Sequence, residues 1–161
     1  MNEIILKAPA KINLFLKVLG KRNDGYHNIY SWFQAIDLFD ILSFKKIKNP
    51  KFILKVKNNS NLSTDENNLI IKTARLMSGL FNFSGGLEIC LEKNIPLSAG
   101  LAGGSTDSAA TIYGINRLFN LKLTNKQMRE IGAKIGSDVP FFFSSGQAEV
   151  TGRGEVIKAR R

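Results

Sequence analysis

The chain has 161 residues, of which 43% are hydrophobic, and this composition is typical of one globular domain with a substantial core. No apolar run approaches the roughly 18 residues of a membrane span, and lysines interrupt the N-terminal segment, so neither a membrane span nor a signal peptide is expected. The net charge of +10 favours a polyanionic partner such as nucleic acid, an anionic membrane or a phosphorylated small molecule, although lysines scattered over a solvated surface explain it without any partner.

The first part of the chain has the alternating pattern of β-strands. Residues 4–20 alternate between apolar and polar positions and end in the turn signal GKRNDG. Residues 26–44 are rich in aromatic and β-branched side chains and predict two further strands, with a break near Asp40. Residues 51–57 alternate cleanly and predict a half-exposed edge strand.

The second part of the chain changes to a helical period. Ser63 and Glu66 form a capping box before a helix that ends near Gly79. A strand over 85–92 leads into a glycine-rich segment, a second helix follows that segment, and Thr124 begins a third helix with another capping box. The remaining chain predicts a β-hairpin and a tail. Strands first, and then helices alternating with strands, define the class as α+β.

The glycine-rich segment, residues 96–106, reads PLSAGLAGGST and lies between the predicted strand and helix. A helix N-terminus offers unpaired N–H groups and a partial positive charge, and glycines let a phosphate approach them closely. The segment lacks the lysine of a Walker A loop and the pattern of a dinucleotide-binding loop. It therefore predicts either a phosphate site built from amides and hydroxyls or a flexible corner, with Ser105 or Thr106 capping the helix.

Four stretches, in this order, resemble motifs of the GHMP kinases, the superfamily of galactokinase, homoserine kinase and mevalonate kinase. They are residues 8–14 (APAKINL), 24–27 (DGYH), 96–106 (PLSAGLAGGST) and 136–140 (GSDVP). Together they are similar to the branch of the superfamily that phosphorylates a cytidylylated methylerythritol in the non-mevalonate route to isoprenoids. Within the third stretch, Ser98-Ala99 stands where many members have glycines.

The resemblance implies a fold like the second domain of ribosomal protein S5, a mixed sheet with helices packed on one face. It also implies that residues 1–161 form the N-terminal, ATP-binding domain of such a kinase, and that the C-terminal domain of the family is absent from this chain. Such a truncated chain is expected to fold, to have little or no activity, and to self-associate through the face left by the missing domain. Since no transit peptide is seen, a bacterial cytoplasm is expected.

The implied reaction transfers the γ-phosphate of ATP, with Mg²⁺, to the 2-hydroxyl of the cytidylylated methylerythritol. In the family, the residue matching Asp138 takes the proton of the attacking hydroxyl, and the residue matching Lys11 keeps that carboxylate ionised and offsets phosphoryl charge. Taken alone, Asp138 is better explained by turn chemistry at a helix end, and Lys11 by a solvated strand face.

The resemblance also implies a set of binding residues. Tyr26 stacks on the cytosine, His27 hydrogen-bonds the edge of the base, and Asn13 contacts the substrate. The implied ATP-binding residues are Asn68, Lys93, Pro96, Leu97, Ser98, Ala99, Gly100, Leu101, Ala102, Gly103, Gly104, Ser105 and Thr106. Either Ser105 or Thr106 contacts Mg²⁺ or phosphate. No metal site made of protein side chains alone is expected, because Cys90 is the single cysteine and His27 the single histidine.

Two alternatives remain. One is another GHMP kinase, of the mevalonate or homoserine type, for which the DGYH stretch would be superfluous because no cytosine has to be recognised. The other is an RNA-binding module that uses the charge of +10 on an S5-like fold. Under the kinase interpretation the partners are ATP and the small-molecule substrate, with neither nucleic acid nor membrane.

Overall fold

The computed structural model describes residues 2–59 and 61–159. Its strands are β1 (Glu3–Lys21), β2 (His27–Ile47), β3 (Phe52–Val56), β4 (Gly86–Glu92), β5 (Gln147–Thr151) and β6 (Val156–Ala159). Its helices are α1 (Leu69–Phe81), α2 (Gly103–Leu118), α3 (Asn125–Ala133) and the short 3₁₀-helix η1 (Val139–Phe143). None of the helices in these residues is long and apolar enough to cross a membrane.

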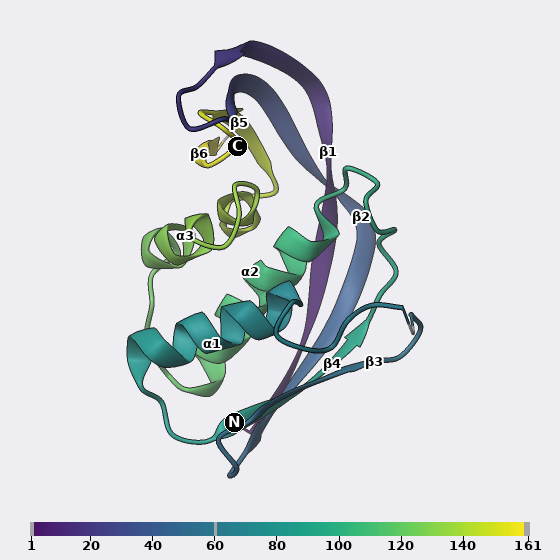
Figure 1. Cartoon of the computed structure of the whole chain (residues 1–161), viewed down its shortest axis with the longest axis vertical. Coiled ribbons are helices and arrows are strands. Elements are labelled where there is room, and N and C mark those ends of the chain that lie inside the picture. Colours follow the sequence, from purple (N-terminus) through teal and green to yellow (C-terminus); the bar gives the residue numbers. More distant parts are fainter. Residues whose placement is uncertain (1, 60, 160–161) are drawn as a thin grey trace.

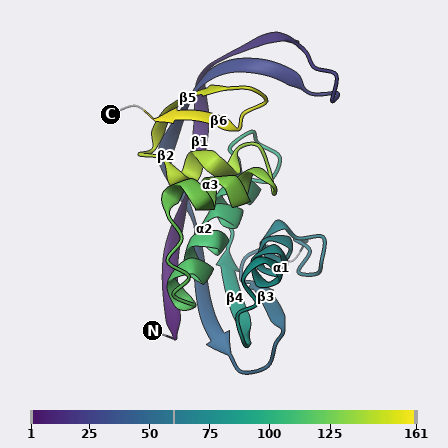
Figure 2. The same cartoon turned by 90° about the vertical axis from the view of Figure 1, so that its left-hand side faces the viewer.

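The strands form one mixed sheet in the order β3-β4-β2-β5-β6, and β1 pairs with β2 along the opposite edge of that strand. Only the β3–β4 pair is parallel among the described strands; the other pairs are antiparallel. The α-helices lie on one face of the sheet, as Figures 1 and 2 show. The α+β class and the mixed sheet with helices on one face, predicted from the sequence, are confirmed.

Strand β2 is the centre of the sheet. It pairs with β1 on one side and, on the other, with β5 over Ser31–Gln34 and with β4 over Ile41–Ile47. The prediction of two strands with a break near Asp40 is wrong, because Asp40 lies inside this one strand. Its carboxylate is fully buried and hydrogen-bonded, so the polar residue does not interrupt the strand.

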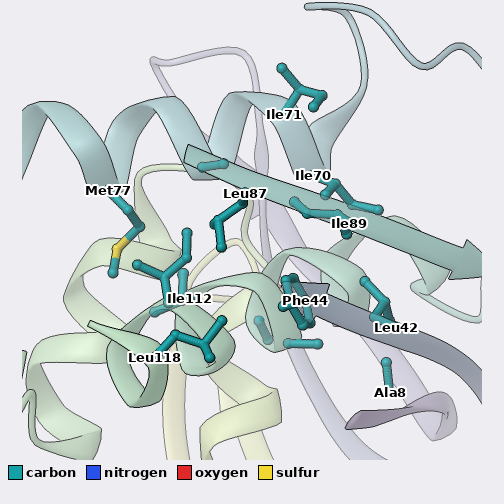
Figure 3. Close-up of a cluster of buried hydrophobic side chains, with 14 of the residues drawn as sticks. Ala8, Leu42, Phe44, Ile70, Ile71, Met77, Leu87, Ile89, Ile112 and Leu118 are labelled. Carbon is teal, nitrogen blue, oxygen red and sulfur yellow. The ribbon is translucent and has the colours of Figure 1, made fainter. Parts of the chain in front are cut away.

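The main core lies between the sheet and helices α1 and α2. Figure 3 shows Ile70 and Met77 of α1 and Ile112 of α2 lying over the sheet. Gly114 allows this approach, since a Cβ there would lie 3.0 Å from Cδ2 of Phe44. The packing fixes α2 against the sheet and thereby positions its N-terminus, where the glycine-rich segment enters.

Two of the predicted helix starts can be compared directly with the structure. The capping box at Ser63 and Glu66 is wrong, because Asn68 caps α1 and accepts the N–H of Ile70 at 2.9 Å. Asparagine is as good an N-cap as serine and lies directly before the apolar residues of the helix. The second box, beginning at Thr124, is confirmed at the start of α3.

Candidate active site

The glycine-rich segment connects β4 to α2 and lies over the N-terminus of that helix (Figure 1). Helix α2 begins at Gly103 with Ala102 as N-cap, and no side chain caps it. The prediction that Ser105 or Thr106 caps the helix is therefore wrong, since both lie within its first turn. The first amides of α2 consequently have no side-chain acceptor, which is the arrangement that binds an anion at a helix N-terminus.

The backbone of the segment is bent at alternate residues. Ser98, Gly100 and Ala102 have φ values of +56°, +74° and +58°, in the left-handed region. Conformations of this kind build concave stretches of backbone N–H groups that bind phosphates. Ser98, which stands where many GHMP kinases have glycine, thus adopts a conformation that glycine adopts without strain.

The structure separates the two candidate hydroxyl residues. Ser105 lines the pocket formed by the glycine-rich segment together with Leu69 and Lys93. Thr106 is 1% exposed and lines a different pocket, beside residues 6–9 of β1. Ser105 is therefore the hydroxyl residue on the side of the helix that carries the glycine-rich segment's pocket.

Asn68 and Lys93 come together with the glycine-rich segment. Both line a second pocket between the starts of α1 and α2, which shares Leu69, Lys93, Leu97 and Gly104 with the first. The two pockets thus form one continuous surface at the N-terminal ends of two helices.

Lys93 is buried rather than exposed. Its Nζ contacts Asp40 and lies 3.0 Å from Oδ2 of Asp107, and both carboxylates are buried. Neither Asp40 nor Asp107 is among the site residues predicted from the sequence. The available signal was an acid within an otherwise apolar strand and helix, a position that is costly unless the acid is paired.

The buried surroundings of Asp107 shift the pKa of its carboxyl group strongly. The pKa of Asp107 is raised to about 7, because burial and the nearby Asp40 raise it more than Lys93 lowers it. Its Oδ1 has no hydrogen-bond partner within the described residues. The folded protein therefore holds a proton on Asp107 at a pH where the unfolded chain, with an ordinary pKa of 3.8, has lost it.

This difference predicts how stability depends on pH. Between about pH 4 and pH 7 the folded state keeps a proton on Asp107 that the unfolded state has lost. The contribution of Asp107 to the free energy of unfolding therefore falls as the pH rises and levels off above that window. Asp107→Asn removes the titrating group, and its stability relative to the wild type should rise by up to about 4 kcal/mol across the window. Urea denaturation at both ends checks this, and parallel pH curves for the two proteins would contradict it.

Lys11 and Asp138 meet beside the glycine-rich segment. Lys11, on β1, is 5% exposed and lies 3.7 Å from Oδ2 of Asp138. Its Nζ donates to Oδ1 of Asn13 at 2.6 Å and to the carbonyl oxygen of Gly100 at 3.1 Å. One buried cation thus links β1, the glycine-rich segment and the carboxylate that precedes η1.

The carboxylate of Asp138 is well placed to accept a proton. Burial raises the pKa of Asp138 above its usual value, while Lys11 lowers it and so keeps the charged form accessible. A raised pKa makes the carboxylate a stronger base. Gly154, with a φ of +124°, passes close by, since a Cβ there would lie 3.2 Å from Oδ1 of Asp138.

Tyr26 and His27 lie apart from this pair, at the turn between β1 and β2. Both are exposed, Tyr26 by 52%, and the guanidinium of Arg153 lies 4.9 Å from the centre of the Tyr26 ring. Asn13 does not join them, because its side chain bonds to Lys11. The β5–β6 turn connects the two places, with Arg153 against Tyr26 and the next residue against Asp138. No motif in the sequence predicts this contact of Arg153.

Comparison with known proteins agrees with this geometry. Residues 68–146 match the family model described as the GHMP kinases N terminal domain. These residues, nearly half of the chain, are therefore similar to the N-terminal domain of the GHMP kinases.

More closely, the chain is 47% identical over 156 residues to proteins named 4-diphosphocytidyl-2-C-methyl-D-erythritol kinase from Bacillus cereus (strain AH187) and Bacillus anthracis. These alignments cover 97% of this chain and 54% of each relative, so the chain spans about half the length of the curated relatives it matches.

Two solved structures resemble the chain along almost its whole length. A crystal structure of 4-(cytidine 5'-diphospho)-2C-methyl-D-erythritol kinase matches 98% of the chain and 55% of its own, with a TM-score of 0.81 and 32% identity. The mevalonate kinase of Methanococcus jannaschii matches 99% of the chain and 56% of its own, with a TM-score of 0.76 and 18% identity, and shares the fold.

Proposed function

We propose that this chain takes part in the ATP-dependent phosphorylation of 4-diphosphocytidyl-2-C-methyl-D-erythritol at its 2-hydroxyl. The observation that carries the proposal is the buried Lys11, which touches both Asp138 and the carbonyl oxygen of Gly100 in the glycine-rich segment. The relatives of that name, at 47% identity, support the choice of substrate. Their bacterial origin supports a bacterial cytoplasm as the place of action.

In this proposal the glycine-rich segment and the free amides of α2 hold the ATP phosphates. Asp138 accepts the proton of the substrate hydroxyl as its oxygen attacks the γ-phosphorus, and the bond to the bridging oxygen of ADP breaks. The Lys11 ammonium lies between the base and the segment, where it offsets the charge of the transferred group. Positioning and electrostatics together supply most of the catalysis of phosphoryl transfer.

The residues on the phosphate side fit a magnesium ion held mainly by ATP. Among residues 2–59 and 61–159 no cluster of three or more acidic, His or Cys side chains forms a metal site. Mg²⁺ in kinases is usually bound by one or two protein oxygens together with phosphates, and the Ser105 hydroxyl faces the right pocket. When bound, the ion would neutralise charge on the phosphates.

The cytidine end of the substrate is assigned to the β1–β2 turn. Tyr26 offers an exposed ring face for stacking on the cytosine, and the adjacent His27 can hydrogen-bond the edge of the base. From there the diphosphate and the erythritol would extend past the β5–β6 turn to Lys11 and Asp138. Asn13, bonded to Lys11, lies at the hydroxyl end.

Equilibrium titration tests this assignment against RNA binding. The protein should bind Mg·ATP and CDP at separate sites, so that saturation with one leaves the affinity for the other within about twofold. A single-stranded RNA oligonucleotide should bind more weakly than either and lose affinity steeply with salt. RNA binding that exceeds ATP binding would contradict the proposal, and competition by mevalonate or homoserine would point to another GHMP kinase.

A further inference from the structure

Asp40 holds the segment that leads into the glycine-rich loop. It lies in the middle of β2 and is fully buried. Its Oδ2 contacts Nζ of Lys93, and its Oδ1 accepts the N–H groups of Asn94 at 2.6 Å and Ile95 at 2.8 Å. One carboxylate therefore fixes both the side chain and the backbone of residues 93–95, directly before the loop begins.

Lys93 transmits this constraint to helix α2. A Cβ at Gly103 would lie 2.7 Å from Nζ of Lys93, so the ammonium rests against the first residue of the helix. The same ammonium lies 3.0 Å from Oδ2 of Asp107, one turn further along α2. The position of the helix N-terminus relative to the sheet thus depends on Asp40 through Lys93.

Stabilisation of the fold is a poor explanation for this cluster. Two carboxylates share one lysine, and buried ion pairs contribute little net stability because the charges must be removed from water. Lys93 lines both pockets at the start of α2, and Asp107 lines one of them. Asp40 joins β2 to residues 93–95, and Lys93 joins that segment to α2. The arrangement of the cluster is that of a support for the loop.

We propose that Asp40 is a positioning residue of the nucleotide site. It acts through Lys93 and the amides of residues 94 and 95 and does not touch the ligand. It sets the place of the glycine-rich segment and of the α2 N-terminus, where the phosphates bind. The inference rests on the proposed function, since it concerns the ATP end of that site and not the cytidine end.

Asp40→Asn is the most informative variant. The amide oxygen can still accept from both backbone N–H groups, while the charge that holds Lys93 is lost. Lys93 keeps Asp107 as a partner, and the pKa of Asp107 falls once the charge of Asp40 no longer raises it. Asp107 is then ionised near neutral pH, so no unpaired charge is buried and the fold should persist. We expect the affinity for Mg·ATP to fall about tenfold, and the affinity for CDP at Tyr26 to stay within about twofold.

A matched control comes from the other end of α2. Asn116 is also buried, and its side chain bonds both backbone groups of Leu123 and the sulfur of Met128. Asn116→Ala should lower the melting temperature and leave Mg·ATP affinity unchanged. Titration calorimetry with Mg·ATP and CDP, beside a thermal melt, gives all the readouts on one preparation of each protein.

The outcomes separate the inference from the proposed function. Loss of Mg·ATP affinity alone in Asp40→Asn supports it, whereas unchanged affinity, or equal loss of both ligands, overturns it. A wild-type protein that binds no Mg·ATP overturns the proposed function and the inference together. If Asp40→Asn does not melt cooperatively, the double variant Asp40→Leu/Lys93→Leu replaces the pair by apolar groups, and retained Mg·ATP affinity there overturns the inference.

Discussion

Asp138→Asn is expected to lower the rate of phosphoryl transfer by about 10²–10⁴-fold, the usual contribution of a general base, while Mg·ATP affinity changes by less than about threefold. Asparagine keeps the shape of the side chain but cannot accept the hydroxyl proton. The carboxylate lies beside Lys11, where it can accept the hydroxyl proton, so its loss should act on the chemical step. Single-turnover rates with protein in excess, beside Mg·ATP titration, separate the two effects.

Ser137→Ala is the control, because it alters the neighbouring residue and leaves the carboxylate in place. Lys11→Met adds a test of direction. Since Lys11 lowers the pKa of Asp138, its removal should raise that pKa and move the acidic limb of the pH–rate profile to higher pH. An Asp138→Asn protein with the wild-type rate would remove this residue from the mechanism.

Gly103→Val is expected to weaken Mg·ATP binding by well over about tenfold. A valine side chain here would stand in the path of an approaching phosphate, and the structure adds a second reason. A Cβ at Gly103 would lie 2.7 Å from Nζ of Lys93 and 3.1 Å from Cγ2 of Ile95, so valine must displace the buried lysine or shift the start of α2. Either movement would disturb the amides that we propose bind the phosphates.

Gly79→Val is the matched control, since a Cβ at that glycine of α1 has no neighbour within 4 Å. Any effect that both variants share reflects helix propensity or general stability. Fluorescent ADP binding and a thermal melt on each protein give the comparison. A cooperatively folded Gly103→Val protein with wild-type affinity would show that the glycine-rich segment does not bind the nucleotide phosphates.

Local patterns predicted the elements whose signals lie within a few residues. The capping box at Thr124 and the strand that leads into the glycine-rich segment are of this kind. The break expected near Asp40 failed because what decides that position lies far away in the chain. By sequence alone, an acid within a strand pattern indicates that the strand is interrupted. In the fold, the carboxylate of Asp40 contacts Lys93 and accepts two backbone N–H groups, all more than 50 residues later, so the strand continues.

The candidate site likewise contains residues that short motifs predict and residues whose role depends on contacts far away in the chain. Lys11, Asp138 and the glycine-rich segment were found through short motifs, and the structure brings them together. Asp40 and Asp107 belong to no motif, because their role depends on one lysine between a strand and a helix. The choice of Ser105 over Thr106 likewise needed the start of α2, which lies earlier than the sequence suggested.

We propose that Lys11 and Asp138 together catalyse the transfer of a phosphoryl group from ATP to a cytidylylated methylerythritol. The most direct measurement is mass spectrometric detection of the monophosphorylated product, with protein in excess over substrate so that a slow step is still seen. We expect slow formation of product from the wild-type protein with Mg·ATP, at least about 10²-fold less with Asp138→Asn, and none from mevalonate or homoserine. Equal product from the Asp138→Asn protein, or product from mevalonate or homoserine, would contradict this mechanism.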